Sequence, residues 1–170
     1  GVWQIILNPT RVVEGQYDLW LPSENVLNRG TGFLYPDEEV TLTIPSTADK
    51  VISVGAYDAL TFSYASFSGR GYTWQDERTK PDLVAPGVNV RTTAVGGGVT
   101  VVSGTSFATP FVTGASALLM EWGIVRGNDP FLYGEKVKAY LRRGARELPG
   151  FGKYPNREVG YGEDVIIRLH

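Results

Sequence analysis

The spacing of apolar residues changes along this chain, and the change separates expected strands from expected helices. Val99–Val102 is a run rich in β-branched residues that stops at Ser103-Gly104, which predicts a strand. A helical pattern follows over Phe111–Trp122, because large apolar side chains recur there at spacings of three and four residues. The small residues Gly114–Ala117 would let other backbone approach closely, so we expect a central helix buried on several sides.

In the first part of the chain, several segments have apolar and polar residues in alternation. Val2–Leu7, Gln16–Leu21 and Glu39–Ile44 are each predicted to form strands. Short antiparallel strands joined by turns are typical of a β-sandwich, and so few strands would leave one face of the sheet bare. Because a natural chain rarely opens inside a strand, we expect this sequence to be a piece of a longer protein.

A different pattern begins after Pro45–Lys50, which has the character of a domain boundary. Val51–Ala56 is a continuous apolar strand of the kind that is buried in a parallel sheet. Further along, Gly96–Gly98 is expected to turn the chain back toward the strand at Val99–Val102. Strands of this type followed by helices predict an α/β fold.

A second helix is predicted with Asp129 as its N-cap, Pro130 in its first turn and Gly144 at its end. Its apolar side is formed by Val137, Tyr140 and Leu141. Three cations stand near its C-terminus, where they interact favourably with the helix dipole: Arg142, Arg143 and Arg146. Three charges are too few for a binding footprint, so we interpret them as a solvated face. The tail, 160–169, is short enough to be a closing strand or a helix stub.

Composition narrows the class of protein. The chain has 170 residues, 42% of them hydrophobic, which is enough for a sizeable core. The net charge of −2 comes from mixed signs, which gives no nucleic-acid footprint. We find neither an apolar run of bilayer length nor a leader pattern, so we expect no membrane partner. Since there is no cysteine, disulfides and thiol chemistry are excluded, while the compartment stays undecided.

One serine stands where the strand meets the first helix, in the segment Gly104–Pro110. Backbone N–H groups at a helix start have no intrahelical partner, and the positive end of the helix dipole adds to their attraction for an anion. These groups could stabilise the oxyanion formed when the Ser106 hydroxyl attacks a carbonyl group. On position alone, an ordinary helix cap at Thr105 or Ser106 is the more frequent arrangement.

The whole segment Gly-Thr-Ser-x-Ala-x-Pro resembles the nucleophile motif of the subtilisin-like serine proteases, in which Ser106 would be the nucleophile. Other segments are similar to motifs of the same family: Val51–Ala56, Ala65–Ser68, Lys80–Gly87 and, more weakly, Gly160–Gly162. The resemblance runs from about Thr43 to Gly162. It implies an α/β fold, the C-terminal half of a subtilisin-like parallel-sheet domain.

The first 44 residues differ from a plain subtilisin. Trp20-Leu21-Pro22 and Thr41–Ser46 resemble the end of the jelly-roll insertion found in clostridial germination-type and related bacterial members. The resemblance therefore implies two regions. Residues 1–45 would be the end of an inserted β-sandwich, and residues 46–170 would be the C-terminal part of the catalytic domain.

The family's catalytic triad runs Asp, His, Ser along the chain, and only the serine motif is found here. The side-chain amide that completes the family's oxyanion hole also belongs to an upstream stretch. The only histidine, His170, is the last residue, and we interpret it as a tail rather than as the base. By resemblance, the N–H of Ser106 would be one oxyanion donor, and the Thr105 hydroxyl would give secondary support.

The implied reaction is peptide hydrolysis through an acyl-enzyme on Ser106, with an upstream His and Asp and with no metal or organic cofactor. The implied partners are a peptide or protein substrate and the upstream part of the same polypeptide. Alone, the chain is expected to be inactive and to self-associate. One alternative is a non-catalytic family member with a regulatory or binding role. A weaker one is an unrelated structural domain in which Ser106 is only a cap, and the Lys80–Gly87 match counts against it.

Overall fold

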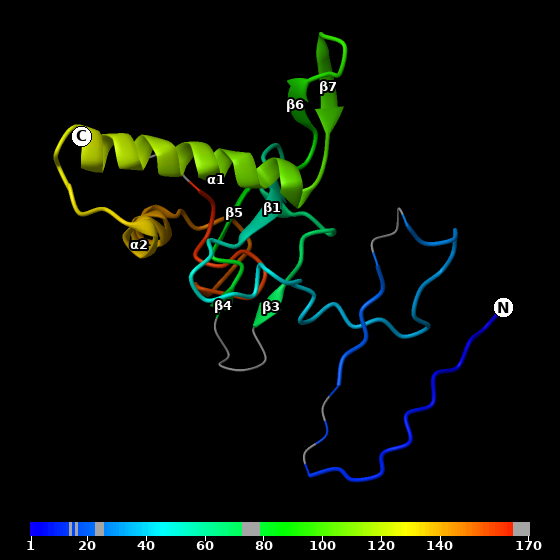
Figure 1. Ribbon diagram of the computed structural model, residues 1–170. Coiled ribbons are helices and arrows are strands. Elements are labelled where there is room, and N and C mark those ends of the chain that lie inside the picture. The colour runs from blue at the N-terminus through cyan, green and yellow to red at the C-terminus, as the bar shows by residue number, and fades with distance from the viewer. Residues whose placement is uncertain (14, 16, 23–25, 73–78, 165–170) are drawn as a thin grey trace. The chain divides into compact units, whose positions relative to one another are not determined.

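The structure is a computed structural model that describes residues 1–13, 15, 17–22, 26–72 and 79–164. It divides into two compact units, Gly1–Asp37 and Glu38–His170. All the α-helices and β-strands found among the described residues belong to the second unit (Figure 1). The segment around Ser106 therefore has to be understood within that unit.

The first unit differs from the expectation of strands. Its described residues contain no strand, so the predictions at Val2–Leu7 and over the described part of Gln16–Leu21 are wrong. Their apolar side chains are exposed, and Trp3 is 93% exposed. Alternation fixes which side chains a strand would bury, but a strand forms only with a pairing partner and a layer to cover it. The assignment of residues 1–45 to an inserted β-sandwich stays a prediction.

The third predicted strand, Glu39–Ile44, is likewise wrong, since the structure gives this segment turns and irregular backbone. Val40 adopts a positive φ of 54°, which interrupts the extended alternation that a strand requires. The backbone of Val40 lies against Gly71, where a Cβ atom would come within 2.7 Å of the Val40 nitrogen. Close packing at this point therefore replaces strand pairing.

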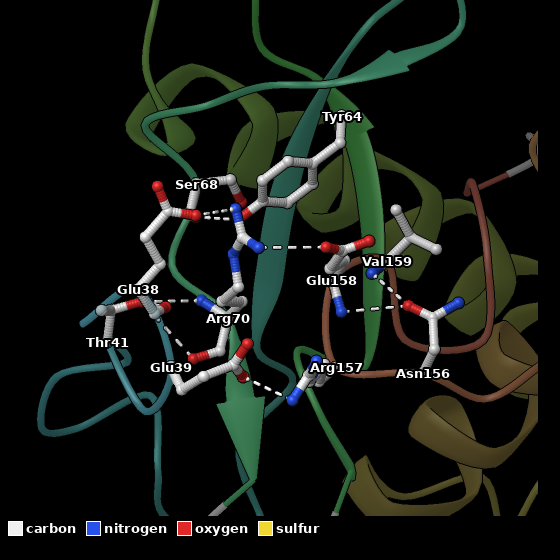
Figure 2. A network of polar contacts seen from close by, with 10 residues as sticks. All are labelled: Glu38, Glu39, Thr41, Tyr64, Ser68, Arg70, Asn156, Arg157, Glu158 and Val159. Atoms are coloured by element: carbon white, nitrogen blue, oxygen red, sulfur yellow. Dashed lines mark hydrogen bonds and ion pairs between the residues drawn. The ribbon is translucent and has the colours of Figure 1, made fainter. Parts of the chain in front are cut away.

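Arg70 is the centre of a polar cluster that fixes the start of the second unit (Figure 2). Its guanidinium forms ion pairs with Glu38 at 2.9 Å and Glu158 at 3.0 Å. It also lies over the ring of Tyr64, 5.0 Å from the ring centroid. The backbone N–H of Thr41 donates to the Arg70 carbonyl at 2.9 Å. Because these partners lie far apart in sequence, the cluster anchors the first residues of the unit to its C-terminal part.

The core sheet has the strand order β2-β1-β5. Its strands are β1 at Val54–Asp58, β2 at Ser63–Tyr64 and β5 at Leu83–Pro86. The central strand β1 is antiparallel to β2 and parallel to β5, and its middle residues are buried. The buried parallel strand predicted at Val51–Ala56 is thus confirmed, although it begins at Val54.

Two antiparallel pairs complete the strands of the described chain. The first joins β3 at Gly71–Tyr72 to β4 at Thr79–Lys80. The second is a hairpin of β6, Val90–Thr93, and β7, Val99–Val102, which projects near the start of α1 (Figure 1). The strand predicted at Val99–Val102 is confirmed. So is the glycine turn, because Gly96–Gly98 all have positive φ, which glycine adopts without steric cost.

The first helix, α1, spans Thr105–Met120 and continues as a π-helix, η2, over Glu121–Val125. One side of α1 is buried against β1 and β5 through Ala108, Val112, Ala115 and Leu119. The other side is open, with Phe111 42% and Leu118 50% exposed. The helix is confirmed, but the expectation of burial on several sides is wrong within this unit, since the sheet covers one side only.

The joined helix Thr105–Val125 is long and apolar enough to cross a membrane, contrary to the expectation that no apolar run has that length. Core helices have the same length and composition. The burial of one side of α1 on the sheet accounts for its apolar character without a bilayer. The absence of a membrane partner stays a prediction.

The second helix, α2, spans Gly134–Gly144, so its end is as predicted and its start is not. Asp129 does not cap it, because residues 129–132 form a turn in which Leu132 N–H donates to the Asp129 carbonyl at 3.0 Å. The Asp129 carboxylate instead pairs with Lys136 at 2.6 Å. A capping residue and a turn residue share the same sequence signal, and here the turn forms.

A buried carboxylate, Asp82, is held by three cations. Its side chain contacts Lys80 at 3.0 Å, Lys138 at 3.3 Å and Arg142, whose Nε donates at 3.0 Å. Burial alone would raise the pKa of the Asp82 carboxyl, but hydrogen bonds from Ser53 N–H and Arg142, with the charge of Lys80, lower it below its ordinary value. The interpretation of Arg142 as part of a solvated face is therefore wrong.

The C-terminal part closes the sheet at Gly160–Gly162. Tyr161 N–H donates to the Asp82 carbonyl and Val84 N–H donates to the Gly162 carbonyl, both at 2.9 Å. Both glycines have positive φ, and a Cβ atom on Gly160 would overlap the carbonyl oxygen of Pro81. The tail was expected to be a closing strand or a helix stub. Its described residues, up to 164, form isolated β-bridges, as a closing strand would, and residues 165–170 lie outside the described residues.

Candidate active site

The start of α1 lies against the loop that follows β5. Gly87 N–H donates to the Tyr57 carbonyl at 3.0 Å, and Gly104 N–H donates to the Gly87 carbonyl at 2.8 Å. A Cβ atom on Gly87 would lie 2.5 Å from the Cβ of Ala56 and 3.1 Å from the Gly104 oxygen. Glycine is therefore the residue that lets these three segments approach so closely.

The Ala65–Ser68 segment supports the same arrangement from the other side of β1. Ala56 N–H donates to Ser68 Oγ at 3.0 Å, and Ala65 N–H donates to the Ala56 carbonyl at 3.1 Å. A Cβ atom on Gly55 would lie 2.9 Å from Ser68 Oγ. The structure thus brings the family-like segments, which are far apart in sequence, into one packed unit behind the start of α1.

The helix itself begins with backbone contacts. Gly104 is the N-cap, with φ of 152°, and there is no side-chain cap hydrogen bond. Its carbonyl accepts from Phe107 N–H at 3.0 Å and from Ala108 N–H at 3.3 Å. Since neither Thr105 nor Ser106 caps the helix, the interpretation of these residues as ordinary caps is wrong.

Ser106 is the second residue of α1, and its side chain is exposed. No hydrogen bond joins its hydroxyl or its N–H to another described residue, and the first turn carries no acidic side chain. An anion at this position would meet unpaired N–H groups and the positive end of a helix dipole. The arrangement is able to hold an oxyanion beside a nucleophilic oxygen.

An attack by Ser106 requires a base that accepts its proton. None of the described residues is a histidine that could be this base. The only histidine of the sequence, His170, lies outside the described residues. Within the described chain, no group of three or more His, Cys, Asp or Glu side chains is arranged to hold a metal ion. The described residues around Ser106 are therefore an exposed serine at a helix N-terminus, with no histidine beside them.

A cavity of about 340 Å³ lies beside the Asp82 cluster, and Lys138, Arg142 and Tyr161 are among its lining residues. None of the lining residues belongs to 103–110. Enclosed cavities are the usual sites for small molecules. The exposed position of Ser106 instead suits a large ligand that reaches it from solvent.

One contact beside the helix start was not anticipated from the sequence. Asn89 N–H donates to Ser103 Oγ at 2.9 Å, and Asn89 has a positive φ of 52°. Asparagine tolerates this conformation better than most residues, so its position after Pro86-Gly87 indicated a turn. The partner could not be predicted, because the residues between Asn89 and Ser103 form the hairpin of β6 and β7, whose register was unknown.

Comparison with known proteins assigns this chain to a family. The model of the subtilase family, the subtilisin-like peptidases, matches residues 34–162. The chain belongs to this family. The match begins before Thr43, where the sequence resemblance was placed, and ends at Gly162.

Individual relatives agree with this assignment. The structure of the CspB protease of Clostridium perfringens is 49% identical with a TM-score of 0.78, over 82% of this chain and 30% of that one. The membrane-bound transcription factor site-1 protease of Mus musculus is 37% identical over 135 residues, or 76% of this chain. Serine protease AprX of Bacillus subtilis is 34% identical over 129 residues, or 64% of this chain.

The chain corresponds to a limited part of these relatives. It spans 12% of the length of the mouse protein and 27% of AprX. What the whole protein does therefore has to be argued from the residues that this part contains.

Proposed function

We propose that the protein containing this chain is a serine endopeptidase of the subtilisin type. Ser106 attacks the scissile carbonyl, and the acyl-enzyme that forms is then hydrolysed by water. An upstream histidine accepts the Ser106 proton, and an upstream aspartate orients that histidine. The N–H of Ser106 donates to the oxyanion, and the hydroxyl of Thr105 gives secondary support.

The observation that carries the proposal is the position of one exposed serine. Ser106 lies in the first turn of α1 with no hydrogen bond to another described residue. It lies two residues after Gly104, whose N–H donates to the carbonyl of Gly87 at the end of the Lys80–Gly87 segment. A serine that served as a helix cap would have its hydroxyl bonded to an N–H of the first turn, and Ser106 makes no such bond.

The proposed partners are a peptide or protein substrate and the upstream part of the same polypeptide. The open side of α1 supports the second, because Phe111 and Leu118 are 42% and 50% exposed there. Exposed apolar side chains favour association, so the isolated chain should self-associate or bind its upstream part. A monodisperse monomer by light scattering that unfolds cooperatively in calorimetry would contradict this.

The decisive experiment is labelling of Ser106 by a serine-directed fluorophosphonate. The isolated chain should react slowly, because a serine hydroxyl without a base is a poor nucleophile. With the upstream part present, labelling should become rapid. Mass spectrometry of the peptide spanning Val99–Met120 locates the label, and Ser106→Ala is the control that removes it.

The alternative function, a non-catalytic regulatory or binding member of the family, gives the opposite result. In that case the protein folds and the upstream part binds, but Ser106 stays unreactive. Rapid labelling of the isolated chain would instead show that a base within this chain had been overlooked. A variant truncated before His170 tests the one histidine that could serve.

A further inference from the structure

A short turn, residues 87–89, joins β5 to β6 and lies beside the loop that leads from β7 into α1. Gly87 is held from behind, since its N–H donates to the Tyr57 carbonyl at 3.0 Å at the end of β1. Val88 packs against the main hydrophobic core. The turn is therefore fixed to the sheet at both its backbone and its middle side chain.

Two hydrogen bonds connect this turn to the residues before Ser106. The Gly87 carbonyl accepts from Gly104 N–H at 2.8 Å. Ser103 Oγ accepts from Asn89 N–H at 2.9 Å. The two residues held in this way, Ser103 and Gly104, immediately precede the first turn of α1.

The second bond depends on an uncommon backbone conformation. Asn89 has φ of 52°, in the left-handed region that asparagine enters more readily than most residues. The N–H of the residue in this conformation is the donor to Ser103 Oγ. Ser103 and Asn89 therefore act as a pair, in which one residue presents the donor and the other the acceptor.

We propose that Ser103 is a positioning residue for the nucleophile. Its hydroxyl, by accepting the Asn89 N–H, fixes the loop that carries Gly104 and so sets where the Ser106 oxygen and N–H lie. This inference rests on the proposed function, because it assigns a role toward the attack by Ser106. Ser103 itself touches no reacting atom.

The location of the hydrogen bond between Asn89 and Ser103 indicates that it positions Ser106 rather than stabilises the fold. Ser103 is exposed, so its bond competes with water and adds little to folding. Yet it acts three residues from Ser106, where small displacements matter. A misplacement of about 1 Å in a catalytic group can cost roughly a hundredfold in rate.

The test uses the full-length protein and the rate constant for fluorophosphonate labelling of Ser106. Ser103→Ala should lower this rate constant about tenfold, as expected for a partial displacement. Ser103→Thr keeps a hydroxyl and should restore most of the rate. Thr100→Ala is the matched control, because Thr100 lies on β7 opposite Thr92 and its exposed hydroxyl makes no hydrogen bond to a described residue.

A second readout separates positioning from unfolding. If Ser103→Ala only unfolded part of the sample, fewer molecules would label, each at the parental rate. A positioning role predicts complete labelling at a lower rate and a reduced kcat with little change in KM for a peptide substrate. Hydrogen exchange at the Asn89 amide should also become faster in Ser103→Ala and not in Thr100→Ala.

Each outcome of these measurements either supports the positioning role of Ser103 or overturns it. A Ser103→Ala protein that labels as fast as the parent and as Thr100→Ala would overturn the positioning role while leaving the proposed function intact. Equal loss in Ser103→Ala and Ser103→Thr would also overturn it, because the hydroxyl would then not matter. A parent that does not label at all would contradict the proposed function, and the positioning role with it.

Discussion

Two polar regions of the second unit have opposite characters. At Asp82, a carboxylate that is fully buried contacts three cations and a backbone N–H, and its two oxygens are both occupied. At Ser106, an exposed hydroxyl and the N–H beside it have no partner among the described residues. Both regions lie in segments that resemble family motifs.

The difference distinguishes polar groups that stabilise the fold from polar groups that are able to bind a ligand. Buried polar groups must be paired because an unpaired one costs free energy, so a saturated cluster indicates a role in the fold. Groups that stay unpaired at a helix N-terminus are free to bind an external atom. We therefore expect changes at Asp82 to affect stability and changes at Ser106 to affect activity.

The largest effect should come from Ser106→Ala in the full-length protein. Peptidase turnover should fall by about a million-fold, the scale known for loss of the nucleophile in subtilisin. The free energy of unfolding should change by no more than about 0.5 kcal/mol, because the side chain is exposed and unpaired. Steady-state hydrolysis and denaturant unfolding measure the two quantities, and activity within tenfold of the parent would refute the nucleophile role.

The converse is expected for Asp82→Ala. This change would leave three cations without their buried counter-ion. Removing one partner of a buried ion pair costs about 3–5 kcal/mol of unfolding free energy. Denaturant titration measures this loss. Asp82→Asn, which keeps the shape and part of the hydrogen bonding, should lose less. Unchanged unfolding in both variants would show that the contacts of Asp82 with Lys138 and Arg142 of α2 do not stabilise the fold.

A matched pair of arginines sharpens the comparison within one helix. Arg142 donates to Asp82 and lies 4.9 Å from the ring centroid of Tyr161, whereas the side chain of its neighbour Arg143 contacts no acidic or aromatic partner among the described residues. Arg142→Ala should cost about 1.5–3 kcal/mol, as for a hydrogen bond to a charged group, while Arg143→Ala should cost less than about 0.5 kcal/mol. Thermal unfolding of both variants checks the difference, and equal losses would argue against the specific role of Arg142.

The last prediction concerns a half-buried carboxylate, Asp164, that forms no ion pair with a described residue. Burial raises the pKa of Asp164 from 3.8 to about 6. The folded state then binds more protons than the unfolded state between these values, so stability should fall as the pH rises from about 4 to about 6. Asp164→Asn should flatten this part of the profile of unfolding free energy against pH. At Asp82, where the pKa is lowered, the sign is opposite and stability is lost as the pH falls.

The sequence was sufficient to predict those elements whose signal lies in residues that are neighbours in the chain. The strand Val99–Val102, the glycine turn at 96–98 and the end of α2 at Gly144 follow from β-branching and from the conformational freedom of glycine. The junction that places Ser106 in the first turn of a helix was predicted in the same way. These features depend on residues that are neighbours in the chain.

Features that depend on distant partners could not be predicted. Val2–Leu7 has the alternation of a strand, but alternation does not provide the strand it would pair with. Arg142 stands at a helix end where a solvated cation is common, and its partner Asp82 is 60 residues away. The contact between Asn89 and Ser103 likewise depends on the register of the hairpin between them. Pairings across long loops require tertiary packing, which periodicity does not describe.

The Arg70 cluster has a consequence for how much the length of the segment before Glu38 can change. Glu38 and Thr41 are tied to Arg70, and Arg70 is tied to Glu158, so the entry point of the unit is fixed by its own residues. The cost of a longer connecting segment grows slowly with its length. We therefore expect that lengthening or shortening the segment before Glu38 leaves the sheet and α1 in place.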